Sequence, residues 1–333
     1  MGIDYEALDL NELRQEMQRV SEEPGAGQGQ GEGLEKYVRL PERDGFVILR
    51  ILPKRKSQQF YCVTRVHTLN NPAGRNKRTY HCPRTLQMGT RGKQQWMGDC
   101  IICKYYNDLW QKSEKLSGKA QEDLQQQARA IKPVERYYYN VIVRAEKDKD
   151  GNVKKNAGPK IYSCGKTVHA KILRAMLGDS VAGEKALGDV THVKDGRDFR
   201  VVKKVVKGGG GQEYPNYDNS KFEEPSPLGS LDEIEKWLEN MHDLQALRVV
   251  KNSDELKHAL RVHLGLVNEG ADAADTELEE FRTAGSAPAP AAAPERVRDS
   301  LAKSSSSSPE APKAPAPDEY ADEDFLKELE DFK

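Results

Sequence analysis

Four residues that can bind a transition metal lie close together in the chain and limit how this region can fold. Cys100 and Cys103 form a Cys-x-x-Cys pair. Cys82 precedes Cys100 with 17 residues between them, and His67 precedes Cys82 with 14 residues between them. Three thiolates and one imidazole complete the tetrahedral ligand shell of a structural zinc ion. The sequence therefore predicts one structural Zn²⁺ held by these four residues, in a subdomain near residues 62–110.

Other interpretations of these residues stay open. His81 competes with His67 as the imidazole ligand, although adjacent His81 and Cys82 would need a tight local geometry to share one ion. Cys62 is assigned to a strand interior. For the Cys-x-x-Cys pair, the alternative to metal binding is a pair of buried or redox-active thiols. A base-deaminase zinc site needs a His-x-Glu motif, which the sequence lacks, and a closed shell leaves no position for water. We therefore expect a structural metal and no catalytic residues.

The charge of the chain is divided unevenly along its length. The formal net charge is −1, but residues 34–222 carry 38 basic and 19 acidic side chains, a net charge of +19. Residues 1–33, 223–270 and 271–333 have net charges of −6, −5 and −9. A basic surface of this density attracts polyanions, of which nucleic acid is the commonest. The alternative interpretation is that these Lys and Arg side chains form an ordinary solvated surface with no polyanionic partner.

Short apolar runs in the basic segment predict strands. These runs are residues 46–52, 60–66, 137–144, 160–164 and 199–206. The intervening pattern predicts helices at 104–131 and 166–177, and a turn at 148–152. Short strands separated by helices are typical of an α+β protein with a small closed or half-closed barrel, and they disfavour a parallel sheet.

The flanking segments differ from this core. Residues 4–20 predict an amphipathic helix with Leu10, Leu13, Met17 and Val20 on one face, followed by a Gly-rich linker at 25–33. Residues 229–264 predict a helical extension. Beyond residue 270 the chain is rich in Ala, Pro, Ser and acid, which predicts a disordered acidic tail. We therefore divide the chain into an arm (1–33), a core (34–222), a helical extension (223–270) and a tail (271–333).

The basic core also contains most of the aromatic residues. Rings stack on unpaired bases while Lys and Arg follow the phosphates, so this mixture suits single-stranded nucleic acid. Tyr138 is expected to face opposite to Tyr137 and Tyr139, because side chains alternate along a strand. Core packing is the alternative for each ring taken alone, and Lys54, Arg55 and Lys56 add a basic cluster. The remaining rings are Tyr105, Tyr106, Trp110, Tyr162, Tyr214 and Tyr217.

These features together resemble a known family, the replicative single-stranded DNA-binding proteins of T-even-like bacteriophages. The resemblance rests on the His67, Cys82, Cys100 and Cys103 set, the serine run and the acidic-apolar C-terminus. It also rests on four stretches, VILRILPKRKSQ at 47–58, YYYNVIV at 137–143, KIYSCGK at 160–166 and YPNYDNSKF at 214–222. It spans most of the chain.

The resemblance implies an OB-fold core with an inserted zinc subdomain that binds single-stranded DNA cooperatively in replication, recombination and repair. It places the DNA-facing rings at Trp110, Tyr138, Tyr162, Tyr214 and Tyr217, beside the basic residues Lys54, Arg55 and Lys56. It implies three partners: the DNA, further copies of the chain, and replication and recombination proteins that bind the acidic tail. The preference for DNA over RNA comes from the resemblance alone.

The arm departs from the family pattern. In the family the arm is basic and carries a Lys/Arg-Ser/Thr motif that docks on the neighbouring protomer, whereas residues 1–33 here are acidic and the nearest such motif is at 54–57. Cooperativity would then either depend on the apolar face of the 4–20 helix or be weaker than in the family.

Two other classes of function compete with this interpretation. One is a zinc-dependent nucleic-acid-modifying enzyme such as a nuclease, which would need acidic or histidine clusters beyond the metal set. The other is a zinc-ribbon adaptor that binds only protein. The sequence has no run of 18 apolar residues and no signal-peptide pattern at its start, so we expect no membrane partner and a location in the host cytoplasm.

Overall fold

The computed structural model describes residues 8–21, 34–54, 60–70, 77–89, 93–147, 153–208, 211 and 213–267. The chain divides into two compact units, Met1–Leu69 with Lys77–Leu256, and Asn70–Asn76 with Lys257–Lys333. The predicted linker at 25–33, the turn at 148–152, Arg55, Lys56 and the tail at 271–333 lie outside the described residues. None of the described helices has the length and apolar character that crossing a membrane would require.

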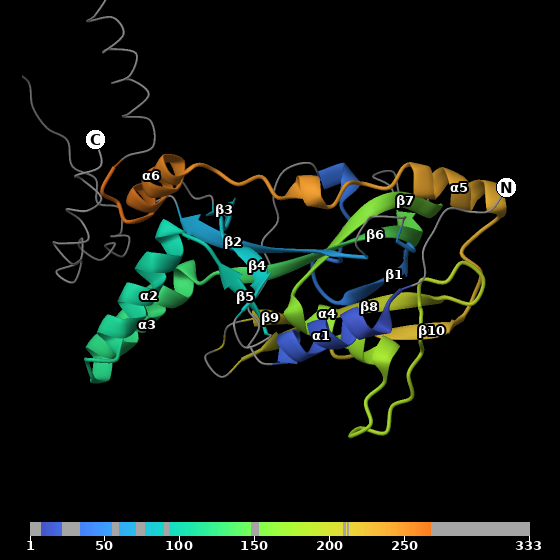
Figure 1. Ribbon diagram of the computed structural model, residues 1–333, viewed down its shortest axis with the longest axis horizontal. Helices are drawn as coiled ribbons and strands as arrows, with labels where there is room; N and C mark the ends of the chain where they lie inside the picture. Colours follow the sequence, from blue (N-terminus) through green and yellow to red (C-terminus); the bar gives the residue numbers. More distant parts are fainter. Residues whose placement is uncertain are drawn as a thin grey trace, which may run out of the picture. The chain divides into compact units, whose positions relative to one another are not determined.

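The main element of the first unit is an eight-stranded sheet within the described residues (Figure 1). Its central path runs β10-β8-β1-β6-β2-β3, with β7 paired to β6 and β9 paired to β8. The strands are β1 (Gly45–Ile51), β2 (Cys62–Asn70), β3 (Lys77–His81), β6 (Val134–Lys147), β7 (Val153–Cys164), β8 (Arg197–Lys207), β9 (Glu213–Asn216) and β10 (Lys221–Pro225).

The long strand β6 explains why this sheet curls. Its residues 134–138 pair with β2, its residues 141–143 pair with β1, and β7 pairs along its length. The register with β7 shifts between Val141 and Val143, and such irregularities bend a strand. The result is a curled half-barrel sheet with helices, which confirms the predicted mixed fold with a half-closed barrel, and its strand pairs β1–β6, β1–β8, β2–β6 and β6–β7 are antiparallel.

Two predicted helical regions are subdivided in the structure. Residues 104–131 form two helices, α2 (Ile101–Ser113) and α3 (Gly118–Ile131), and Gly118 at the start of α3 adopts a positive φ of 64°, which glycine tolerates. Residues 229–264 form α5 (Leu231–Glu239), the short 3-10 turn η2 (Gln245–Leu247) and α6 (Ser253–His263). A second 3-10 turn, η1 (Leu34–Lys36), precedes β1, and a separate hairpin joins β4 (Thr85–Met88) to β5 (Gln94–Met97). The predicted helix at 166–177 is confirmed as α4 (Lys166–Leu177).

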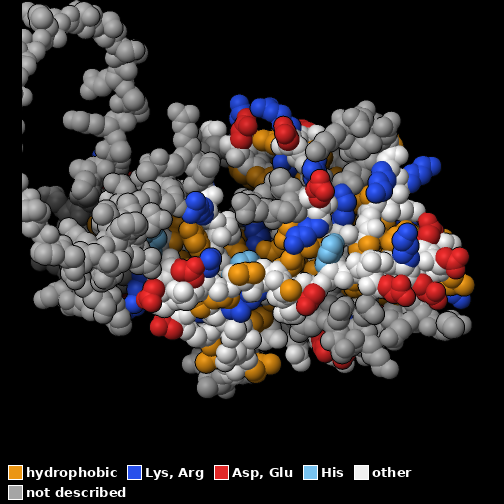
Figure 2. Space-filling view, turned by 90° about the horizontal axis from the view of Figure 1, so that it is seen from above, with side chains coloured by type: hydrophobic (Ala, Val, Ile, Leu, Met, Phe, Trp, Pro, Cys, Tyr) orange, Lys and Arg blue, Asp and Glu red, His pale blue; other side chains and the backbone are white. Residues whose placement is uncertain are grey.

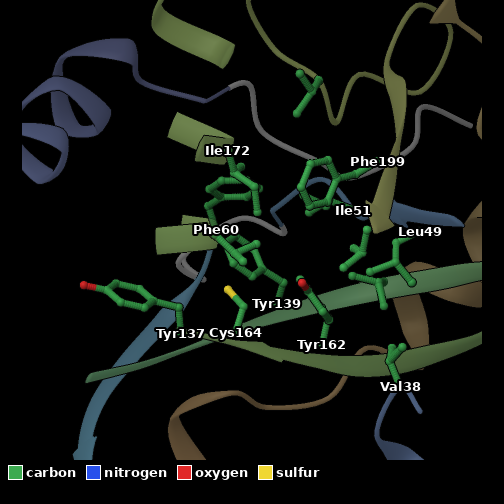
Figure 3. Packing of buried hydrophobic residues seen from close by; sticks show 14 of the residues in the cluster. Val38, Leu49, Ile51, Phe60, Tyr137, Tyr139, Tyr162, Cys164, Ile172 and Phe199 are labelled. Atoms are coloured by element: carbon green, nitrogen blue, oxygen red, sulfur yellow. The ribbon is translucent and has the colours of Figure 1, made fainter. Parts of the chain in front are cut away.

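The two faces of the sheet have separate cores. Tyr137, Tyr139 and Val141 point into the larger cluster, which includes Leu49 and Phe199 (Figure 3). The alternate residues point the other way. Ile142 packs with Trp237 of α5, and Tyr138 packs in a smaller cluster. The predicted opposite orientation of Tyr138 and its two neighbours is therefore confirmed.

The amphipathic helix predicted at 4–20 is present as α1 (Leu10–Ser21), and residues 1–7 lie outside the described part. It packs beside α4 on the face of the sheet opposite α5 (Figure 1). Leu13 is 4% exposed in the larger core, and Met17 packs against the same cluster. Leu13 and Met17 of the predicted apolar face thus pack within the chain itself.

Candidate metal centre and nucleic-acid interface

The four predicted metal ligands come together at one buried point. His67 lies on β2, Cys82 follows β3, Cys100 caps the N-terminus of α2, and Cys103 lies in the first turn of that helix. Their ligand atoms all lie within 4.8 Å of one another, and all four residues are buried. The three cysteines are free thiols, as are Cys62 and Cys164.

The spacing of these atoms fits a metal ion. The Sγ atoms of Cys82 and Cys103 are 3.6 Å apart, and His67 Nε2 is 3.5 Å from the Sγ atoms of both Cys100 and Cys103. Metal–sulfur bonds of about 2.3 Å and metal–nitrogen bonds of about 2.0 Å give tetrahedron edges of about 3.5–3.8 Å. These three distances match the edges of such a tetrahedron, and the cluster could hold one metal ion.

The surroundings prepare both ligand types for metal binding. His67 Nδ1 lies 3.1 Å from the carbonyl oxygen of Ile131, and this contact leaves Nε2 directed at the thiols. Hydrogen bonds with the Cys100 thiol, the Cys103 thiol and the Arg84 backbone lower the pKa of the Cys82 thiol, whereas hydrogen bonds with Cys100 and Cys82 raise the pKa of the Cys103 thiol. A thiolate is the form that binds metal.

Cys62 differs from the cluster. Burial raises the pKa of its thiol to about 11, and the residue packs among apolar neighbours. Cys62 is the first residue of β2 and is 2% exposed, so it is buried on a strand as predicted but at the start of that strand and not in its interior. His81, the alternative imidazole, is at the end of β3 and is not part of the cluster.

Three of the five predicted DNA-facing rings are at least partly accessible. Tyr214 on β9 is 50% exposed. Trp110 on α2 is half-buried and stacks on Tyr106 one turn earlier, with ring centroids 6.3 Å apart. Tyr217 is half-buried against the larger core cluster.

The other two predicted rings, Tyr138 and Tyr162, are buried in the structure. Tyr162 is 1% exposed and lies opposite Tyr139 in the larger core (Figure 3). Tyr138 is 8% exposed and packs with Cys62, Ile161 and Leu244 on the other face of the sheet. Since neighbouring residues of a strand alternate between faces, this register cannot place the two rings in one cleft.

A basic residue lies near Tyr214, the most exposed of the five predicted DNA-facing rings. Lys204 lies opposite Asn216 and Val206 lies opposite Tyr214, so Lys204 and Tyr214 share one face of the β8–β9 hairpin. Of the predicted basic cluster, the structure describes Lys54, which is half-buried. Figure 2 shows Lys and Arg side chains at several places on the face in view, interleaved with Asp and Glu.

A buried polar network that the sequence did not indicate joins three elements at Glu135. This carboxylate accepts hydrogen bonds from Arg19 of α1 at 2.9 and 3.0 Å, from Trp96 of β5 and from the Tyr137 hydroxyl. The Tyr137 ring stacks on His169 of α4 with centroids 3.7 Å apart. These partners are far apart in the chain, so no local spacing could have indicated them.

The structure is that of a mixed α/β protein with a curled half-barrel sheet and a buried three-cysteine, one-histidine cluster that could hold a metal ion. Residues 43–263 match the family model described as "gp32 DNA binding protein like". This match spans more than half of the chain, so the chain belongs to that DNA-binding family, and the predicted resemblance is confirmed. No curated protein matches the chain.

Proposed function

We propose that the protein binds single-stranded DNA without sequence specificity and without catalysis, and acts in DNA replication, recombination and repair. The observation that carries this proposal is the family match over residues 43–263. The excess of basic over acidic side chains in residues 34–222 supports it, because neutralising phosphates is the main source of affinity for nucleic acid. Its location would be the host cytoplasm.

The proposed DNA contacts combine stacking and charge. Tyr214 and Trp110 offer accessible rings for unpaired bases, and Tyr217 is partly accessible. Lys204 beside Tyr214, and the cluster of Lys54, Arg55 and Lys56, would follow the phosphates. Tyr138 and Tyr162 would then brace the OB-fold-like sheet and would reach a base only after a conformational change.

The proposed metal is one structural Zn²⁺ held by His67, Cys82, Cys100 and Cys103. Three thiolates and one imidazole are a donor set typical of structural zinc, and the buried, four-ligand arrangement leaves no position for a reacting water. The ion would hold β2, β3 and α2 together in a region with few apolar residues.

The proposed partners beyond DNA follow the proposed division of the chain. The arm (1–33) would support cooperative binding of further copies along DNA, through residues other than Leu13 and Met17, which pack within the chain. The acidic tail (271–333) would recruit replication and recombination proteins. The core (34–222), with its metal subdomain near 62–110, would bind the DNA, and residues 223–270 would extend the core.

Substitution of Tyr214 by alanine tests the proposed interface. We expect Tyr214→Ala to weaken binding of an oligo(dT) by about tenfold, since one base–ring stack contributes about 1–3 kcal/mol. Tyr214→Phe keeps the ring and should bind like the unchanged protein. Fluorescence anisotropy at fixed salt measures both.

Val181→Ala is the control, because Val181 is an exposed apolar side chain, at 98% exposure, that follows α4 and is not part of the β8–β9 hairpin. Equal affinity of Tyr214→Ala and the unchanged protein, or equal losses for Tyr214→Ala and Val181→Ala, would contradict the proposed role of Tyr214.

A further inference from the structure

The segment at residues 241–248, which follows α5, lies across the sheet and reaches the metal cluster. Near its start the side-chain amide of Asn140 donates to the carbonyl oxygen of His242 and accepts from the His242 backbone N–H, both at 3.0 Å. In its middle, Leu244 is 7% exposed and packs on Cys62 and Tyr138. The segment is therefore held to β6 and β2 by side-chain contacts and not by strand pairing.

Arg248 at the end of this segment contacts the metal-binding turn. Its Nη2 lies 3.1 Å from the carbonyl oxygen of Cys82, 2.8 Å from that of Pro83 and 3.3 Å from that of Arg84. One guanidinium thus binds the backbone of a metal ligand and of the two residues after it. These contacts connect positions more than 160 residues apart.

The geometry of this turn decides where the Cys82 thiolate points. On one side, the Cys82 backbone N–H donates to the carbonyl oxygen of Arg65 on β2 at 2.8 Å. On the other side, the Arg84 backbone hydrogen-bonds the Cys82 thiolate. Since Arg248 binds the carbonyls of the same turn, it restrains the peptide groups that direct the thiolate.

The charge of Arg248 suits the same role. Three thiolates and one divalent ion leave a net negative charge of about one on the loaded cluster. A guanidinium beside it compensates that charge, and the three carbonyl oxygens share the two N–H donors of its Nη2. A lysine at this position would keep the charge but carries it on a shorter side chain with a differently placed nitrogen.

We propose that Arg248 is a positioning residue of the metal site and that it couples metal binding to the ordering of residues 241–248. The inference rests on the metal centre proposed above. If the loaded site favours the Arg248 contacts, these contacts must favour the loaded site by the same free energy. Outer-shell partners of metal ligands change metal affinity by about 10–100-fold when they are removed.

The test measures release of zinc from the full-length protein to a chromophoric chelator in excess. We expect Arg248→Ala to release zinc about 10–100-fold faster than the unchanged protein, and Arg248→Lys to lie between them. Arg174→Ala is the matched control, because Arg174 is an exposed arginine of α4 whose side chain is 51% exposed and pairs with Asp179. This control should release zinc at the unchanged rate.

A second measurement distinguishes positioning from general destabilisation. Amide hydrogen exchange at residues 244–248 should accelerate when zinc is removed from the unchanged protein, and it should no longer respond to zinc in Arg248→Ala. If Arg248→Ala folds poorly, the response of residues 244–248 to zinc is compared between Arg248→Lys and the unchanged protein, and it should be weaker in Arg248→Lys. Zinc release from Arg248→Ala at the unchanged rate, or an unchanged response of residues 244–248 to zinc, overturns the proposal. An unchanged protein that purifies without metal and binds no added zinc overturns the metal centre itself, whatever its affinity for DNA.

Discussion

Cys100→Ser is expected to abolish retention of the metal and to unfold the segment that surrounds it, while the main sheet stays folded. Cys100 contributes one of four converging ligand atoms and is 3% exposed. Binding of structural Zn²⁺ contributes about 10–16 kcal/mol in small zinc peptides at pH 7, which is as large as the whole stability of a typical domain, about 5–15 kcal/mol. Among the described residues, the β4–β5 hairpin forms a sheet separate from the main sheet. We therefore expect the folding of this hairpin and of the neighbouring helices α2 and α3 to depend most on the ion.

Elemental analysis and thermal unfolding with and without chelator check this prediction. The unchanged protein should carry one metal equivalent and melt at a lower temperature after chelation, and Cys100→Ser should behave like the chelated protein. Cys62→Ala is the matched control, because Cys62 is a buried cysteine outside the cluster and its substitution should leave the metal in place. A melting temperature that is the same with and without chelator would argue against a structural metal.

Arg19→Ala is expected to release helix α1 from the sheet. Arg19 binds two buried carboxylates, Glu16 and Glu135, together with the hydroxyl of Tyr137. Loss of one partner from a buried ion pair costs about 3–5 kcal/mol because the remaining charge is left without compensation. Undocking of α1 avoids part of this cost, since it returns Glu16 to water while Glu135 keeps its bonds from Trp96 and Tyr137. The loss should therefore appear as exposure of α1 and not as unfolding of the core.

Hydrogen exchange over residues 10–21 measures this release directly. Arg14→Ala is the matched control on the same helix, because Arg14 is exposed and bonds Asn11 one turn earlier. Rapid exchange of α1 in Arg19→Ala beside slow exchange in Arg14→Ala is the expected result. Slow exchange in both variants would mean that the buried network does not hold the helix.

Acid should have the same effect on α1 as Arg19→Ala. Burial opposes ionisation of Glu16, but hydrogen bonds from Arg19 and His169 outweigh it and lower its pKa from 4.5 to about 2. A depressed carboxyl pKa stabilises docking above the usual pKa, and this contribution is lost as the pH falls from about 4.5 towards 2. Burial also lowers the pKa of His169, so its protonation in the undocked state acts in the same direction below pH 6.5.

The metal site and most of the sheet could be predicted from local sequence. A metal ligand has to be one of a few residue types, so the cysteines and histidine of a metal site can be seen in the sequence. The residue types and spacing of His67, Cys82, Cys100 and Cys103 therefore identified the cluster directly. Apolar runs likewise marked β1 and β8, because a buried strand needs apolar side chains wherever it pairs. The limits of α4 agree with the prediction because Gly165 and Gly178 bound an apolar-periodic segment.

The surroundings of the aromatic rings could not be predicted in the same way. The alternation of side chains along a strand predicts which rings lie on the same face of the sheet. It does not predict which of the two faces is covered by another segment of the chain. Tyr138 is buried because Leu244, more than a hundred residues later, packs on it, and Tyr162 is buried because its register places it opposite Tyr139 in the core. The contacts of Arg19 and Arg248 also join distant residues, and an arginine in a sequence gives no sign of the carboxylate or carbonyl that it binds.

A salt titration of oligo(dT) binding tests the central claim, that this chain binds single-stranded DNA through a basic surface with accessible rings. The account predicts quenching of tyrosine and tryptophan fluorescence at about 50 mM salt, relieved by added salt. The logarithm of the binding constant should fall linearly with the logarithm of the salt concentration, with a slope of about −0.7 per phosphate contacted. Absence of quenching at the lowest salt, or an affinity that does not change with salt, would contradict it.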